Sequence, residues 1–346
     1  EINYINTEYE IDFNNIVFIK TRLDQGKIKL IDFLSSLNLW LSMDNKILLV
    51  GGNGALGSIL NQELSKSKIN IFNLSRNSFS DKNNKNILVK DNDSQEQFFK
   101  NIFSKYSFDT VIYLAGVWRG MNDDEENFNE NFYPFRDFIN TVGKKINKII
   151  FFSSSAVYGM NKDFLENKIN DEANSSYGKA KIMSENLLIE FCEENLKSYT
   201  ILRPFHIVSP FESYRKGRSH VITDFVHLAL NSKDEFEAKF NNLLKEPYIP
   251  FTWGYDLVKV IEKLASMGEL DNEIYNIGAK DTYNLIQLHN TISRRIQDKI
   301  LDKEIESKVV NYFKKSHIAF GNYSSTKFIN MLDFFIKHKL KEYKNA

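Results

Sequence analysis

The sequence predicts an α/β protein built on a Rossmann-type, doubly wound parallel sheet, with a smaller mixed lobe covering one edge of the sheet. Two observations support this prediction. After about residue 43, short apolar runs alternate with amphipathic segments, as expected for strands joined by helical crossovers. The runs at 111–114 and 149–152 are apolar throughout, which is typical of strands that helices cover on both faces.

The individual elements follow from this alternation in chain order. The apolar runs predict strands at residues 47–50, 69–74, 87–89, 110–114, 149–153 and 200–203. Helical spacing of apolar residues predicts helices at residues 56–66, 96–105, 131–144 and 177–195. The acidic run at 123–126 is interpreted as a solvated loop. Beyond Pro204 the rhythm loosens, and a helix is predicted at 222–230.

Three parts are predicted along the chain. Residues 1–42 form an N-terminal extension of unknown role, because the first strand begins shortly after Met43. Residues 43–205 are predicted to form a dinucleotide-binding Rossmann domain, because a glycine-rich turn at 51–57 follows the first strand. Residues 206–346 form mainly the lobe, the expected place for substrate, with some segments returning to the sheet domain.

Composition excludes several classes of protein. The 346 residues include 45 Lys and Arg against 45 Asp and Glu, so there is no general attraction to nucleic acid or an anionic membrane. No apolar run has the length of a membrane span, and the N-terminus lacks a signal-peptide pattern. The single cysteine, Cys192, suits a reducing cytoplasm. No residues show metal-ligand spacing, so no metal site is expected.

A glycine-rich turn follows the first predicted strand. Gly51, Gly54 and Gly57 recur at intervals of three between an apolar run and an amphipathic helix. Glycines permit a tight turn and close approach of a ligand, and the helix N-terminus attracts phosphate. The setting predicts a site for the pyrophosphate of NAD or NADP, with Ala55 and Leu56 also in contact.

The end of the second strand bears on which dinucleotide is used. An acid that binds the NAD ribose is usual there, but this chain has Ser75 followed by Arg76. A guanidinium can bind a 2′-phosphate with two hydrogen bonds, which slightly favours NADP. An exposed arginine without a ligand is the competing interpretation. Asp91, after the third strand, is a candidate adenine contact, and an ordinary loop carboxylate is the alternative.

Tyr177 and Lys181 lie four residues apart in a predicted helix, so they share one face. A nearby cation favours the ionised phenol and makes it a proton acceptor near neutral pH. Three serines, 153–155, follow the strand that precedes this helix. Together with the glycine turn, the pair predicts a redox enzyme that moves a hydride to or from a carbon bearing a hydroxyl.

Six motifs occur in a fixed order, at residues 51–57, 114–116, 153–159, 177–181, 202–205 and 275–278. In this order they resemble the extended short-chain dehydrogenase/reductase family, and specifically its NAD(P)-dependent sugar epimerase/dehydratase branch. The resemblance covers the chain from about residue 43 onward. It implies an enzyme with a nucleotide-sugar substrate, and a homodimer formed through helices that flank the sheet.

The resemblance also implies roles for individual residues. Tyr177 matches the general acid/base, and Lys181 matches the residue that lowers its pKa and holds the nicotinamide ribose. Ser154 matches the hydroxyl that binds the reacting oxygen, and Asn131 the structural asparagine of the family. Further positions that resemble cofactor contacts are Leu114, Ala115, Gly116 and Pro204.

Five residues are expected to contact substrate: Arg119, Ser155, His206, Arg215 and Arg218. Arg119 lies where cofactor and substrate meet in this fold. His206 stands where the family has an asparagine after Arg-Pro-Phe. The family's clamp arginine is missing, and Arg215 and Arg218 in a basic loop are the candidates to replace it. The alternatives are a solvated basic loop and a packed histidine with one hydrogen bond.

The residues after the serine separate reaction types within the family. Sugar 4,6-dehydratases resemble one another in an Asp-Glu pair there, because loss of water needs an extra acid/base pair. Here Ser155 and Ala156 occupy those positions. The sequence therefore argues against a 4,6-dehydratase. Because residues 153–159 resemble those of many epimerases, the resemblance implies an NAD(P)-dependent epimerase that acts on a nucleotide-sugar through transient oxidation by hydride transfer. The alternatives are an NADPH-dependent ketoreductase of a keto-sugar or other carbonyl, and a non-catalytic dinucleotide-binding regulator.

Overall fold

The computed structural model describes residues 46–67, 69–75, 85–88, 95–117, 124–159, 164–167, 173–241, 243, 248–296, 307–321 and 323–345. The chain divides into two compact units, residues 1–43 and 44–346. All structural statements below concern the second unit. The extension predicted at residues 1–42 lies outside the described residues, and its role stays a prediction.

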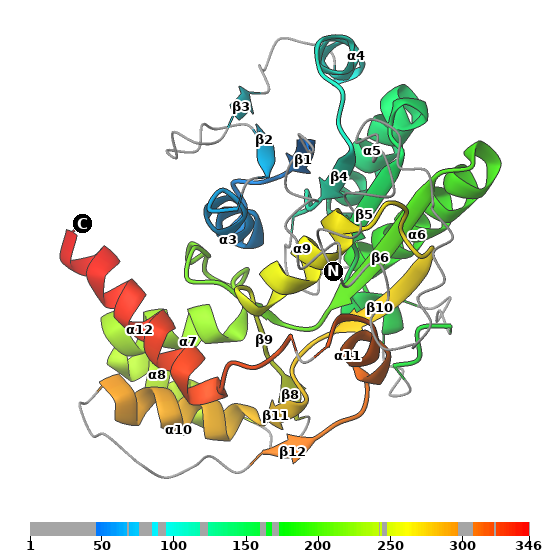
Figure 1. Ribbon diagram of the computed structural model, residues 1–346. Coiled ribbons are helices and arrows are strands. Elements are labelled where there is room, and N and C mark those ends of the chain that lie inside the picture. Colours follow the sequence, from blue (N-terminus) through cyan, green and yellow to red (C-terminus); the bar gives the residue numbers. More distant parts are fainter. Residues whose placement is uncertain are drawn as a thin grey trace, which may run out of the picture. The chain divides into compact units, whose positions relative to one another are not determined.

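A seven-stranded sheet confirms the predicted fold class (Figure 1). The strands lie in the order β10-β6-β5-β4-β1-β2-β3, and every neighbouring pair is parallel. They are β1 (Lys46–Val50), β2 (Asn70–Ser75), β3 (Lys85–Leu88), β4 (Thr110–Tyr113), β5 (Lys148–Phe152), β6 (Ser198–Pro204) and β10 (Glu273–Ile277). The first six correspond to the six predicted strands. The seventh, β10, was not predicted as a strand.

Helices cover both faces of the sheet because side chains alternate along each strand. On β1, Leu48 and Val50 join one apolar cluster, and Ile47 and Leu49 join the other. The first face is covered by α4 (Gln95–Lys105), α5 (Glu125–Val142) and α6 (Ser176–Asn195). The second is covered by α3 (Ala55–Leu64), α9 (Asp256–Ser266) and α11 (Lys314–Phe320).

The helix predicted from residue 131 begins earlier, at Glu125. The Asp124 side chain accepts the backbone N–H of Asn127 and caps the helix. Glu125 and Glu126 occupy the first turn, where the helix dipole favours negative charge. The interpretation of this acidic run as a solvated loop is therefore wrong for residues 124–126.

The lobe lies together at one end of the sheet and has its own apolar core (Figure 1). Its helices are α7 (Val221–Asn231), α8 (Lys233–Phe240), α10 (Leu285–Ile296) and α12 (Phe328–Asn345). Its short strands are β7 (Ile207–Val208), β8 (Ile249–Pro250), β9 (Thr252–Trp253), β11 (Asp281–Tyr283) and β12 (Lys308–Val309). The helix predicted at 222–230 is α7. Among the described helices, none is long and apolar enough to cross a membrane.

Candidate active site

The glycine turn joins β1 to α3 and packs tightly against its neighbours. Gly51 has φ +88°, and a Cβ there would lie 2.8 Å from the Ala115 backbone. A Cβ on Gly57 would lie 2.5 Å from the Cα of Gly52. The turn is tied to β2 by the Gly51 N–H, which donates to the Leu74 carbonyl at 2.9 Å. Glycine is therefore required at both positions by the protein's own backbone.

The N-terminus of α3 is suited to hold a phosphate. Its N-cap residue is Gly54, and no side chain caps the helix. The first-turn N–H groups, which include those of Ala55 and Leu56, lack partners within the helix and attract an anion. A buried hydrogen bond of 2.7 Å from Asn61 Nδ2 to the Gly52 carbonyl holds the turn against the helix. These residues fit the pyrophosphate of a dinucleotide.

Replacing Gly57 with Ala tests this fit. The added methyl group would meet the Gly52 backbone at 2.5 Å, so the turn must move away from the helix N-terminus. We expect the affinity for NAD and NADP to fall at least about tenfold, since a shift of the phosphate cradle loses charge-assisted hydrogen bonds. Isothermal calorimetry measures this, with Gly268→Ala as the control because a Cβ there meets nothing within 4 Å. Equal affinities in the two variants would contradict the assignment.

Ser75 ends β2 beside the glycine turn and is buried. The other two residues predicted to select the adenosine half of the cofactor, Arg76 and Asp91, lie outside the described residues. The slight preference for NADP therefore stays a prediction.

The predicted catalytic residues Ser154, Tyr177 and Lys181 come together at the carboxyl end of β5. Ser154 follows this strand, and its oxygen accepts the Ala156 N–H at 3.2 Å. Its hydroxyl proton is then available to the phenol of Tyr177, to which Ser154 is hydrogen-bonded. Lys181 is buried one turn further along α6, and its ammonium donates to the Phe152 carbonyl at 2.9 Å.

The electrostatics of the pair differ from the expectation. Burial raises the pKa of Tyr177 to about 12, although the Ser154 hydrogen bond opposes this rise. Burial lowers the pKa of Lys181 to about 8, and Glu185 opposes that fall. The Lys181 nitrogen lies 5.7 Å from the centre of the Tyr177 ring. In this structure burial therefore sets the direction of the Tyr177 pKa, and the phenol is protonated at neutral pH.

Asn131 connects α5 to the loop after β4. Its side chain accepts the Val117 N–H and donates to the Val117 carbonyl, both at 2.9 Å. A Cβ at Gly116 would lie 3.0 Å from Asn131 Oδ1 and 3.5 Å from Lys181 Nζ. The structure thus places the loop of residues 114–116, Asn131 and Lys181 side by side.

The residues predicted to contact substrate are less closely gathered. Ser155 begins the short 3-10 helix η3 (Ser155–Tyr158) directly after Ser154. His206 is exposed and has φ +37°, an uncommon backbone conformation that often marks functional positions. Arg215 and Arg218 are exposed, and no hydrogen bond in the described part of the chain fixes their guanidinium groups. Arg119 lies outside the described residues.

Hydrogen bonds to Glu212 anchor the loop that carries Arg215 and Arg218. Glu212 accepts hydrogen bonds from the His220 backbone at 3.0 Å and from His220 Nδ1 at 2.7 Å. The Thr223 hydroxyl donates to the same carboxylate. The tip of the loop is a turn in which the Arg218 N–H donates to the Arg215 carbonyl at 2.9 Å. Both arginines therefore project from an anchored loop at the start of α7.

Sequence reasoning missed a buried polar network behind the catalytic residues. Arg203 on β6 binds both carboxylate oxygens of Glu185 on α6, at 2.6 and 3.0 Å. It also donates to the Tyr158 hydroxyl at 2.8 Å, and this hydroxyl donates to Asn276 Oδ1 on β10 at 2.8 Å. The sequence held one indication that Glu185 belongs to this site: it follows Lys181 by four residues and so lies on the same helix face.

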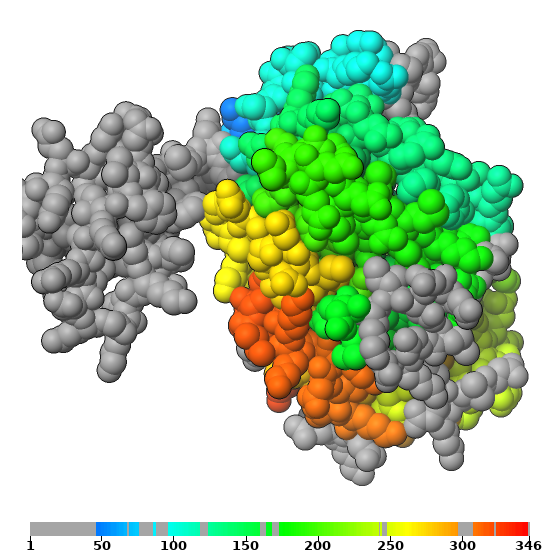
Figure 2. Space-filling model, turned by 90° about the vertical axis from the view of Figure 1, so that its right-hand side faces the viewer, coloured from blue at the N-terminus to red at the C-terminus, as the bar shows by residue number. Residues whose placement is uncertain are grey.

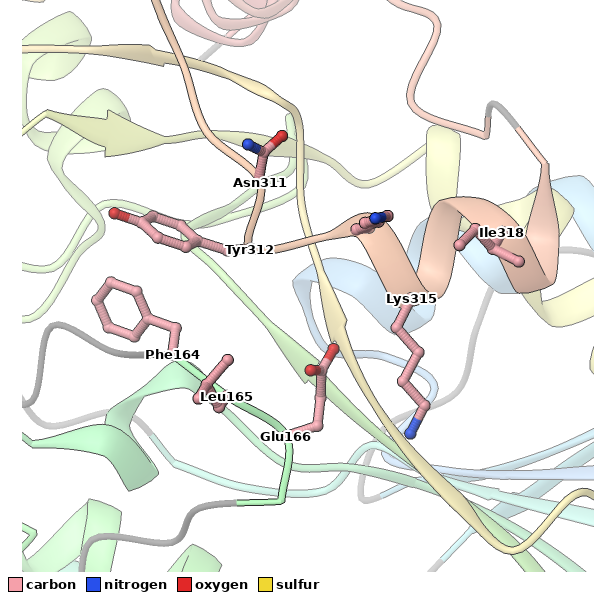
Figure 3. A pocket seen from close by; sticks show the side chains of 8 residues that line it. Phe164, Leu165, Glu166, Asn311, Tyr312, Lys315 and Ile318 are labelled. Atoms are coloured by element: carbon pink, nitrogen blue, oxygen red, sulfur yellow. The ribbon is translucent and has the colours of Figure 1, made fainter.

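A hollow of about 720 Å³ lies beside the edge strand β10, and none of the predicted catalytic residues lines it. Figure 2 shows residues 164–167 beside α11 on this face of the molecule, and Figure 3 shows the two walls that they form. The lining residues are Phe164, Leu165, Glu166, Asn311, Tyr312, Lys314, Lys315 and Ile318. The edge of β10 is already covered, because Glu166 accepts the Asn276 N–H and Lys315 donates to the Ile274 carbonyl. This arrangement blocks pairing with a further strand.

The glycine turn, the parallel sheet and the Ser-Tyr-Lys arrangement together define an extended short-chain dehydrogenase/reductase. This chain belongs to the NAD dependent epimerase/dehydratase family, which matches residues 47–278. A curated relative from Escherichia coli O157:H7 is the N-acetyl-alpha-D-glucosaminyl-diphospho-ditrans,octacis-undecaprenol 4-epimerase. It is 25% identical over 264 residues, which are 75% of this chain and 74% of the relative.

Solved structures share the fold at low sequence identity. An epimerase from Methanothermobacter thermautotrophicus has a TM-score of 0.72 at 18% identity, covering 88% of this chain and 95% of its own. The UDP-N-acetylglucosamine 4-epimerase of Methanobrevibacter ruminantium, solved with UDP-N-acetylmuramic acid, has a TM-score of 0.68 at 20% identity, covering 86% and 99%. Other neighbours were solved with NAD or with NADP.

Proposed function

We propose that this chain is an NAD(P)-dependent epimerase that inverts a hydroxyl-bearing carbon of a nucleotide-linked sugar through transient oxidation. The observation that carries the proposal is the contact of Ser154 with Tyr177 at the carboxyl end of β5. Lys181 and the loop of residues 114–116 lie beside this contact. A phenol, a hydroxyl and an ammonium in this arrangement can bind a sugar hydroxyl and exchange its proton.

In this reaction separate residues would bind the cofactor, exchange the proton and bind the substrate. The glycine turn and the first turn of α3 would hold the cofactor pyrophosphate, and Lys181 its nicotinamide ribose. When bound, NAD(P)⁺ supplies the hydride-accepting carbon and a positive charge that favours the ionised phenol. Tyr177 would take the proton of the sugar hydroxyl and later return it. Ser154 would hold the reacting oxygen, and Arg215 and Arg218 would bind the diphosphate of the substrate.

Three observations bear on the competing functions. Ala156 cannot transfer protons, so the chain lacks one of the two extra acid/base groups that a 4,6-dehydratase uses. Ser75, in place of the usual acid at the end of β2, keeps an NADPH-dependent ketoreductase as the second candidate. An intact Tyr177 and Lys181 pair speaks against a non-catalytic regulator, since binding alone does not need it.

Mass spectrometry of the nucleotide that copurifies with the chain tests the proposal. An epimerase returns its cofactor to the starting state, so we expect retained NAD(P) and interconversion of sugars without net consumption of NAD(P)H. The substrates to compare are UDP-, GDP-, CDP- and dTDP-sugars. Net ketone reduction with added NADPH would favour the ketoreductase. Failure to bind any pyridine nucleotide would contradict both.

A further inference from the structure

The buried ion pair between Arg203 and Glu185 connects the two halves of the catalytic site. Both side chains are completely buried. Glu185 lies on α6, one turn beyond Lys181 and two beyond Tyr177. Tyr158, bound to Arg203 at 2.8 Å, ends the short helix η3 that begins beside Ser154. The pair therefore joins the helix that carries the phenol to the turn that carries the serine.

We propose that Glu185 is a positioning residue of the reaction: with Arg203 it fixes α6 against the Ser154 turn, and it places a negative charge one helical turn from Lys181. The inference rests on the proposed function. It adds a residue outside the reacting groups, because the Glu185 carboxylate makes no hydrogen bond to the Tyr177 phenol or to the Lys181 ammonium. Glu185 acts through Arg203 and through the electric field of its charge.

Further hydrogen bonds of Arg203 and Asn276 hold the ion pair and Tyr158 in place. The Arg203 guanidinium also donates to the Glu166 carbonyl at 3.3 Å. Asn276 accepts from Tyr158 and donates to the Phe164 carbonyl at 2.6 Å. The network thus spans α6, η3, β6 and β10, and ends in one wall of the hollow in Figure 3. A buried network in which each polar group has its partner holds one geometry.

The charge of Glu185 raises the pKa of Lys181. Burial lowers the pKa of Lys181 to about 8, and the charge of Glu185 opposes this fall. Glu185 is the charged group that acts on the pKa of Lys181, and the nearby Tyr177 phenol is neutral at pH 7. Without the Glu185 charge, Lys181 would therefore lose its proton at a lower pH, and the alkaline limb of the activity profile would move to lower pH.

The variant Glu185→Gln keeps the size of the side chain and removes its charge. Glu190→Gln, on the exposed side of the same helix, is the matched control. We expect kcat of Glu185→Gln to fall about tenfold with little change in KM, because binding groups remain while the catalytic groups shift. In carbon-13 NMR, the Lys181 Cε signal, assigned with Lys181→Arg, should titrate at a lower pH in Glu185→Gln than in the wild type. Unchanged kcat or an unchanged Lys181 midpoint would overturn the proposal.

Tyr158→Phe is the second variant, for the case that Glu185→Gln does not fold. It retains the ring and breaks the link from Arg203 to Asn276. We expect a fall in kcat of about fivefold or more with cofactor affinity retained, and a wild-type kcat would overturn the positioning role. If the wild-type chain turns over no sugar, the proposed epimerase fails, whereas the Lys181 titration in Glu185→Gln still decides whether the Glu185 charge acts on the lysine.

Discussion

Replacing Tyr177 with Phe should leave a folded, cofactor-binding protein that has lost turnover by a factor of about 10² to 10⁴, the usual contribution of a positioned acid/base group. The ring remains, and only the hydroxyl that exchanges the substrate proton is removed. The lost hydrogen bond to Ser154 costs about 1 kcal/mol of stability, too little to unfold the domain. Steady-state kinetics and calorimetry with NAD(P) measure the two effects separately.

Tyr133→Phe is the control for this variant. Tyr133 lies on α5 with 39% of its surface exposed, so loss of its hydroxyl should leave the rate unchanged. A Tyr177→Phe enzyme with near wild-type kcat would remove Tyr177 from the mechanism. A variant that no longer binds the dinucleotide would show instead that the phenol has a role in holding the cofactor.

Replacing Arg203 with Met should cost about 3 to 5 kcal/mol of unfolding free energy, because it leaves a fully buried carboxylate without its partner. Met carries no charge and extends about as far as the arginine Nε, so the loss combines an unpaired carboxylate with a small cavity where the guanidinium was. Urea unfolding of the variant and the wild type measures this cost.

The double variant Arg203→Met with Glu185→Leu should recover most of the lost stability, since replacing both members of a buried pair by apolar groups is often neutral. Lys66→Met is the exposed control. Its ion pair with Glu63 spans 2.7 Å with the lysine 68% exposed, and such pairs contribute at most about 1 kcal/mol. A single Arg203→Met variant no less stable than Lys66→Met would mean that the buried pair contributes nothing.

Local pattern sufficed to predict most of the sheet. The apolar runs of β1, β4 and β5 predicted strands correctly, because strands that helices cover on both faces have near-continuous apolar sequences. The strand β10 escaped prediction because Glu273 and Asn276 interrupt its apolar pattern. The structure gives the reason for Asn276: its side chain binds Tyr158, a partner 118 residues away.

The candidate site was predictable to the extent that it lies on one element. Tyr177 and Lys181 share α6, so their spacing alone places them on one face. The partner of Glu185 was not predictable, because Arg203 reaches it from a separate strand. The direction of the Tyr177 pKa was also missed. The sequence places a cation four residues from Tyr177, whereas the burial that raises the pKa of the phenol depends on the assembled fold.

Because β10 pairs with β6, the sheet can be completed only after the lobe segment between them has been synthesised. Residues 205–272 must leave the ribosome after β6 and before its neighbour β10 exists. Until then one edge of β6 presents unpaired N–H and C=O groups, which are a template for other chains. Parallel pairing across such a long segment is also slow. The nascent chain is therefore most exposed to aggregation while the lobe is being translated, and truncation before Glu273 leaves that edge open permanently.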